Sequence, residues 1–249
     1  MLRLIVPFAV LTLTIYTPFG IWAAEMEADS IKYGLVEETE SDIKGKLSKA
    51  ELKSLLLILA SVMLWFIGYN SITSKYSVYA TNILGFDFNF TLIIAQAAAI
   101  VSYIPVGIIA SKLGRKKTIL AGIIILATAF TAGIFITPET PEFIMIPVFI
   151  LAGIGWATIN VNSFPMVVEL AKHGDTGKYT GYYYTASMSA QIIAPILSGI
   201  LYDLLGMKYT FFTFGALFVV FSFVTMFFVK HGDSIPAEKK STLEHLDVD

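Results

Sequence analysis

The chain has 249 residues, of which 56% are hydrophobic and only 14% charged, with a net charge of −2 at pH 7 and no cysteine. Because a soluble domain carries about 25% charged residues, this composition and a mean hydropathy of +0.73 indicate an integral membrane protein. The lack of cysteine excludes disulfides and thiolate metal sites, and the small net charge does not suggest nucleic acid as a partner.

Seven apolar runs are long enough to cross a bilayer, since about 20 helical residues span its ~30 Å hydrocarbon core. The first run, residues 1–24, is expected to be a retained transmembrane helix, because it exceeds the ~7–15-residue core of a signal peptide. Pro7 and Pro18 within it suit a kinked transport helix. The alternative is that residues 1–24 are a secretory signal peptide, with Arg3 in its short basic start and Trp22-Ala-Ala at its end.

Residues 25–53 form a charged linker in which acidic residues come first and lysines follow. Near its end, Ser48 and Glu51 have the spacing of a capping box, in which each side chain bonds a free backbone amide at the start of a helix. The next span is therefore expected to begin near Lys49, although the transporter domain proper is taken as 54–229.

Six further spans follow the linker, and a charged tail ends the chain. We expect the spans at residues 49–79, 89–111, 118–136, 143–171, 179–202 and 209–229. Residues 230–249 are expected to be a disordered cytoplasmic tail. If the linker is also cytoplasmic, all 17 Lys and Arg residues lie on that side except Arg3, Lys75 and Lys208, as the positive-inside rule requires.

A basic turn between two spans, residues 107–118, is repeated at residues 199–210. The coincident pairs are Gly107 and Gly199, Ile108 and Ile200, Leu113 and Leu205, Gly114 and Gly206, Lys116 and Lys208, and Thr118 and Thr210. Three spans separate the two copies, so they lie on opposite sides of the membrane. This predicts an inverted repeat of three plus three helices, an arrangement that transporters commonly use.

The same turn, Gly107-x-x-Ala-Ser-Lys-Leu-Gly-Arg-Lys116, resembles the signature loop of the major facilitator superfamily, Gly-x-Leu-x-Asp-Arg-x-Gly-Arg-Lys. Residues 153–169 and 177–184 are similar to helices ten and eleven of its sucrose-transporter-like and glycoside-pentoside-hexuronide branches. Superfamily members have twelve helices in two halves. The resemblance implies that residues 1–24 correspond to helix six, 25–53 to the central cytoplasmic linker, and 54–229 to the C-terminal six-helix half.

The fold expected is thus all-α and integral to the membrane, with the last six helices forming a major facilitator half. The resemblance implies a secondary transporter in the plasma membrane that carries a sugar or related neutral hydroxylated solute, coupled to protons or another cation. Its partners would be the bilayer, the solute, protons and a separate N-terminal half, because that half is missing here. The alternative is a non-transporting half-transporter that acts as a sensor or assembly partner.

The signature loop departs from the family pattern at Ser111, where the family carries Asp in a charge network at the cytoplasmic mouth. Arg115 remains, and Glu169 at the end of its span is placed to meet it. We hypothesise that this pair closes a cytoplasmic gate, against the alternative of two separately solvated charges. The gate candidates are Gly107, Gly114, Arg115, Lys116 and Glu169.

Polar and aromatic side chains inside spans are candidates for a solute cavity, because they are costly unless they face protein or water. The candidates are Trp65, Tyr69 and Asn70 in the 49–79 span, Gln96 and Tyr103 in the 89–111 span, Trp156 and Asn160 in the 143–171 span, and Tyr184 and Gln191 in the 179–202 span. Aromatic rings stack on sugar rings, and phenol and amide groups bond hydroxyls. The alternative for each residue is helix packing.

Helical spacing sorts these candidates further. Trp65 and Tyr69 share one stripe with Thr73. Asn160 shares a face with Trp156, whereas Asn162 lies about 200° away from Asn160, so at most one asparagine should face the cavity.

Enzyme functions fit the sequence poorly, and no cofactor or metal is expected. His173, His231 and His245 lie in loops or the tail without clustered carboxylates, and no phosphate-binding glycine loop follows a strand. An intramembrane protease would need catalytic groups at mid-depth, which are missing. A seven-helix receptor has no reason to show an inverted repeat.

Overall fold

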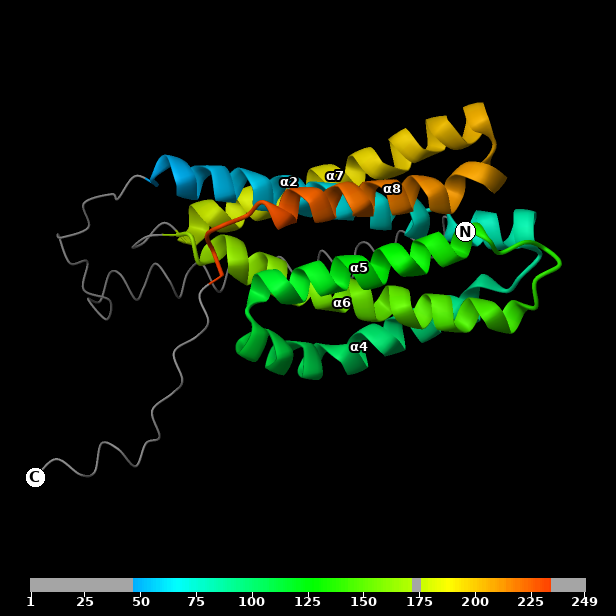
Figure 1. Cartoon of the computed structure of the whole chain (residues 1–249). Coiled ribbons are helices and arrows are strands. Elements are labelled where there is room, and N and C mark those ends of the chain that lie inside the picture. The colour runs from blue at the N-terminus through cyan, green and yellow to red at the C-terminus, as the bar shows by residue number, and fades with distance from the viewer. Residues whose placement is uncertain (1–46, 172–175, 234–249) are drawn as a thin grey trace, which may run out of the picture. The chain divides into compact units, whose positions relative to one another are not determined.

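The computed structural model of the chain describes residues 47–171 and 176–233. The predicted helix at 1–24, most of the predicted linker and most of the predicted tail lie outside these residues. Six helices in the described part are long and apolar enough to cross a membrane, and no strand occurs there. They are α2 (Lys49–Thr73), α4 (Phe88–Leu113), α5 (Arg115–Ile134), α6 (Met145–Val168), α7 (Thr176–Leu205) and α8 (Met207–Phe227). The all-helical membrane fold is therefore confirmed (Figure 1).

The beginnings of α2 and α4 follow local sequence signals. The Ser48 Oγ accepts the Glu51 N–H at 3.2 Å, and the Glu51 carboxylate accepts the Ser48 N–H at 2.8 Å, so the predicted capping box starts α2 at Lys49. Residues 49–53, assigned to the linker by composition, form the first turns of this helix. Asp87 caps α4 in a similar way by accepting the Asn89 N–H at 2.9 Å.

The first described span ends earlier than its hydropathy predicts. It stops at Thr73 rather than near residue 79, and a short helix α3 (Tyr76–Tyr79) and a π-helical turn η1 (Ala80–Leu84) follow. Tertiary contacts account for the break: the Tyr76 hydroxyl bonds Thr91 at 2.8 Å, and the Tyr79 ring stacks on Phe211 at 4.1 Å. These contacts hold the chain against α4 and α8 instead of along the axis of α2.

The six helices form two triplets, α2–α4–α5 and α6–α7–α8, and helices of one triplet pack mainly against helices of the other. Helix α2 packs on α7 and α8, α6 packs on α4 and α5, and α5 contacts α8. Small residues allow close crossings at equivalent places, as is common between membrane helices. A Cβ atom on Gly68 would lie 2.7 Å from the carbonyl oxygen of Gly215, and one on Gly155 would lie 3.1 Å from that of Gly122. The packing thus repeats with the triplets.

The two copies of the repeated turn have the same backbone geometry. Gly114 joins α4 to α5 with φ 90° and ψ 151°, and Gly206 joins α7 to α8 with φ 86° and ψ 127°. Each glycine N–H bonds the carbonyl four residues earlier at 3.0 Å, and the hydroxyls of Thr118 and Thr210 each bond the glycine carbonyl at 2.8 Å. The turns lie at opposite ends of the bundle (Figure 1), as an inverted repeat requires.

At one end of the bundle α2 begins, α4 joins α5, and both α6 and α8 terminate (Figure 1). We call this the basic end. Every described lysine and arginine lies at or near it except Lys75 and Lys208. Burial is uneven along the spans: only 11% of the apolar window of α4 and 22% of that of α7 are buried, against 44–56% for the other four. Helices α4 and α7 therefore present wide apolar surfaces to whatever surrounds the bundle.

Candidate functional site

A cavity of about 350 Å³ lies among the helices and is lined mainly by α2, α4 and α6. Small side chains on α4 and α6 leave this space open, and α5 and α8 each contribute one phenylalanine. The lining residues are Tyr69, Ile72, Thr73, Leu92, Ala95, Gln96, Phe130, Val148, Phe149, Ala152, Gly153, Trp156 and Phe212. No charged side chain is among them.

The polar part of this cavity consists of residues that the sequence predicted. Tyr69 from α2 and Trp156 from α6 face each other with ring centroids 5.9 Å apart, and Gln96 from α4 is exposed into the same space. Tyr103, one of the predicted residues outside the lining, meets the Trp156 ring edge-on at 6.2 Å. The structure thus brings Tyr69, Gln96, Tyr103 and Trp156 together from three helices.

Two residues predicted on α2 take structural roles. Trp65 was expected on the same wall as Tyr69, but its side chain is fully buried in the hydrophobic core with its ring 3.9 Å from that of Phe66. The prediction that Trp65 lines the cavity is therefore wrong. At its position, nearer the basic end than Tyr69, the same face of α2 packs against other helices. The Asn70 amide donates to the carbonyl of Phe66 at 2.8 Å, which satisfies part of its hydrogen bonding within its own helix.

On α6 the two asparagines separate as their spacing predicts. Asn162 is buried and donates to the carbonyl of Thr158 at 2.9 Å, whereas Asn160 is half-buried one turn beyond Trp156 and is not among the residues that line the cavity. Tyr184 and Gln191 are both exposed on α7. Neither lines the cavity, so the structure leaves these two on a separate surface of the bundle.

Several lining residues were not found from the sequence. Phe149 lies seven residues before Trp156, which is two helical turns, so helical spacing could have placed it on the face predicted for Trp156. Phe130 and Phe212 come from α5 and α8 and carry no sequence signal, because a phenylalanine in an apolar span looks the same whether it faces lipid, core or cavity.

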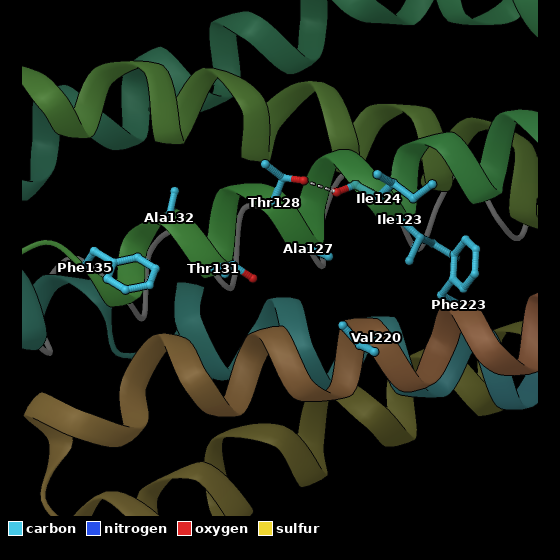
Figure 2. A pocket seen from close by; sticks show the side chains of 9 residues that line it. All are labelled: Ile123, Ile124, Ala127, Thr128, Thr131, Ala132, Phe135, Val220 and Phe223. Carbon is cyan, nitrogen blue, oxygen red and sulfur yellow. Dashed lines mark hydrogen bonds between the residues drawn. The ribbon is translucent and has the colours of Figure 1, made fainter.

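A larger cavity of about 480 Å³ lies between α5 and α8 (Figure 2). Its lining is apolar except for Thr128 and Thr131, and Thr128 already bonds the carbonyl of Ile124 at 2.8 Å. None of the predicted residues reaches it. The smaller cavity is the candidate solute site, because of these two cavities in the described part of the chain it is the one that combines aromatic rings with an amide and a phenol group.

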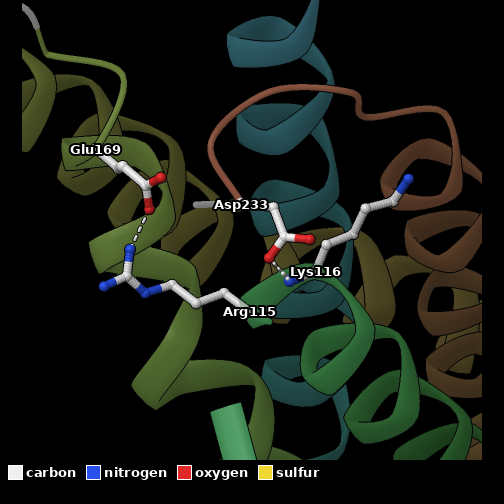
Figure 3. Close-up of polar contacts among 4 residues, drawn as sticks. All are labelled: Arg115, Lys116, Glu169 and Asp233. Carbon is white, nitrogen blue, oxygen red and sulfur yellow. Dashed lines mark hydrogen bonds and ion pairs between the residues drawn. The ribbon is translucent and has the colours of Figure 1, made fainter. Parts of the chain in front are cut away.

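A second polar cluster lies at the basic end, where Arg115 forms an ion pair with Glu169 (Figure 3). Their side chains are 26% and 20% exposed, so the pair is only partly shielded from solvent. Lys116 leaves the turn in the other direction, and its ammonium group donates to the carbonyls of Phe227 at 2.9 Å and Val229 at 2.5 Å. Adjacent residues of the turn thus bind the ends of α6 and α8.

The remaining gate candidates are the two glycines of the predicted loop. Gly114 forms the turn itself, with a positive φ that favours glycine. Gly107 is exposed within α4, and a Cβ atom there would meet nothing within 4 Å. Of these two glycines, Gly114 is therefore the one with a geometric reason to be glycine.

Six apolar helices arranged as two back-to-front triplets, with an aromatic and amide-lined cavity between them, define a six-helix bundle of the kind that forms half of a secondary transporter. The family model of the Major Facilitator Superfamily matches residues 54–246. The chain therefore belongs to the major facilitator superfamily, whose members are membrane transporters rather than enzymes, and it is a multi-pass membrane protein.

Comparison with solved structures supports the same fold. The chain is similar to the human organic anion transporter MFSD10 (TETRAN), with a TM-score of 0.56 and 14% sequence identity. The match covers 76% of this chain and 50% of that one, so the chain corresponds to about half of the human protein's length. No curated protein sequence matches the chain.

Proposed function

We propose that the described bundle is the C-terminal half of a major facilitator transporter that carries a neutral hydroxylated solute, such as a sugar, across the plasma membrane. The observation that carries this proposal is the cavity lining, in which Tyr69, Gln96 and Trp156 offer aromatic faces and hydrogen-bonding groups but no charge. Aromatic rings pack on the apolar faces of sugars while amide and phenol groups bond their hydroxyls. The resemblance to the sucrose-like and glycoside-pentoside-hexuronide branches points to the same solute class.

An organic anion, the solute class named for the human relative, is the competing candidate. It would find no cationic side chain in this cavity, and a buried carboxylate without a counter-charge is strongly disfavoured. An anion would therefore depend on cationic groups outside this cavity.

The orientation that we propose places the basic end and the C-terminus in the cytoplasm. Lysines and arginines are concentrated in cytoplasmic loops, and the described residues of this kind lie at the basic end except Lys75 and Lys208. The Arg115–Glu169 pair then lies at the cytoplasmic mouth, where it joins the beginning of α5 to the end of α6. This position suits a gate that is closed in the structure described here.

A separate six-helix half is the partner that we propose. The exposed apolar side chains of α4 and α7 include Ile93, Ile100, Val101, Ile104, Ile108, Tyr184, Met188, Ile192, Ile196 and Ile200. In addition, the human structure that the bundle resembles has twice the matched length. The titrating group of a proton symporter would lie in this partner half, because the lining of the described cavity contains no carboxylate.

Uptake by proteoliposomes tests the proposed function. Vesicles that contain the chain together with its N-terminal half should accumulate radiolabelled disaccharide, and more so with an imposed proton gradient. Unlabelled sugars should compete and organic anions should not; the reverse order of competition would contradict the solute assignment. Vesicles with the chain alone serve as the control, and absence of uptake in every arrangement would favour the alternative of a non-transporting sensor or assembly partner.

A further inference from the structure

The segment that follows α8 crosses the basic end of the bundle and contacts three helices. We call residues 230–233 the strap. A ring nitrogen of His231, Nδ1, lies 3.0 Å from the Ser54 hydroxyl of α2, and the Lys230 N–H donates to the same hydroxyl at 3.3 Å. A Cβ atom on Gly232 would lie 2.8 Å from the carbonyl oxygen of Met166 in α6, so the strap lies close against the end of that helix.

The last residue of the strap binds the beginning of α5. The Asp233 carboxylate accepts the backbone N–H of Lys116 at 2.9 Å (Figure 3). Helix α5 has glycine at its N-cap position and no side chain of its own turn that caps it. A carboxylate at a helix N-terminus satisfies a free amide and interacts favourably with the helix dipole. Asp233 therefore supplies from the tail the cap that the turn lacks.

The sequence of the turn makes room for this carboxylate. A Cβ atom on Gly114 would lie 2.9 Å from a carboxylate oxygen of Asp233, so a larger residue at position 114 would collide with it. Position 111, where the signature loop of the family carries Asp, is Ser111, whereas the corresponding position of the second copy is Asp203. The copy without its own carboxylate is thus the one that receives one from the strap.

We infer that Asp233 is a positioning residue of the transport cycle: it holds the start of α5 so that Arg115 meets Glu169 and the basic end stays closed. The inference rests on the proposed function. Lys116, whose amide binds Asp233, is adjacent to Arg115, and its ammonium group binds the carbonyls at the end of α8. Strap and ion pair thus form one network that ties both triplets together, and opening of the basic end must break it.

Cysteine labelling in the assembled two-half transporter tests this inference without knowledge of the solute. The chain has no cysteine, so Gln96→Cys places one reporter in the cavity. Its rate of modification by a membrane-impermeant maleimide is measured from the side of the basic end. Asp233→Asn should raise this rate about threefold to tenfold, in keeping with the loss of a helix cap. Ser54→Ala, which releases the strap from α2 and leaves α5 intact, should raise it by a smaller factor.

Two controls separate positioning from general loosening. Asp203→Asn removes an exposed carboxylate near the equivalent turn at the opposite end and should leave the rate unchanged. Asp233→Asn combined with Glu169→Gln should exceed the larger single effect only slightly, since both act through one network. Equal rates in Asp233→Asn and the parent, or fully additive effects, would overturn the inference. If sugar uptake fails but the labelling rates shift as expected, the solute assignment is contradicted, whereas the positioning role of Asp233 is supported.

Discussion

Single residues of the same type have different roles in this bundle, as the two described tryptophans illustrate. Trp65 and Trp156 were both predicted at the cavity, and both lie in spans of similar hydropathy. Trp65 is fully buried in the core, whereas Trp156 is half-buried between Tyr69 and Tyr103 and lines the cavity. The surroundings of a ring, and not its type, decide whether it can meet a solute.

Alanine at these two positions should therefore affect different properties, stability at Trp65 and solute uptake at Trp156. Trp65→Ala should lower the free energy of unfolding by about 3–5 kcal/mol, the usual cost of deleting a buried aromatic ring, and shift the melting temperature of the detergent-solubilised protein. Trp156→Ala should change the melting temperature much less and raise the KM for uptake about tenfold. A stability loss at Trp156 that matched the one at Trp65 would assign both rings to packing.

The Arg115–Glu169 pair allows a second prediction at this scale. Because both side chains keep some solvent contact, Glu169→Gln should weaken the closed state by about 1 kcal/mol, which corresponds to about a fivefold shift in its population. Uptake by the assembled transporter should change accordingly. Glu139→Gln, an exposed residue of the loop between α5 and α6 at the opposite end, is the matched control. Unchanged uptake and conformational preference in Glu169→Gln would show that the pair is only a surface contact.

At the scale of helices, close crossings at glycine set the shape of the cavity. Gly153 lines the cavity on α6, and a Cβ atom there would collide with the backbone carbonyl of Ala95 on α4. Since a backbone carbonyl cannot move aside as a side chain does, α4 and α6 are this close only because position 153 is glycine. The crossing therefore depends on one missing methyl group.

Gly153→Ala should separate α4 from α6 and destabilise the bundle by about 1–3 kcal/mol, as overpacking does. Thermal unfolding in detergent measures this change. Gly181→Ala in α7 is the control, because a Cβ atom there would meet nothing within 4 Å and alanine favours the helix. Equal melting temperatures for the two variants would argue against the close α4–α6 crossing.

At the scale of the whole bundle, the six helices form one pseudo-symmetric unit. The turns at Gly114 and Gly206 are equivalent, and each triplet packs on the other in the same way. Lys116 and Lys208, which coincide in the repeat, lie in the first turns of α5 and α8, and these two helices begin at opposite ends of the bundle. A membrane crossed by the six helices separates these two residues.

Single cysteines at Lys116 and Lys208 test this arrangement directly, because the chain has no cysteine of its own. In sealed vesicles of one orientation, an impermeant maleimide should label one of the two variants from outside and the other only after permeabilisation. Labelling of both from the same side would contradict the inverted repeat and the transporter half that it implies. Detergent-solubilised protein, in which both positions should react, controls for accessibility.

The sequence by itself determined the six spans of the described part apart from the end of the first, the start of α2 and the repeated turn, because hydropathy, capping residues and turn glycines act within a few residues of one another. Helical spacing also identified Tyr69, Gln96 and Trp156. Only the tertiary structure decided that Trp65 is core, that the chain breaks after Thr73 and that Asp233 caps α5. Each of these depends on which helix lies opposite, and contacts such as that between Asp233 and Lys116 join residues more than a hundred positions apart. A helical stripe reports which side chains share a face, but only packing decides what that face meets.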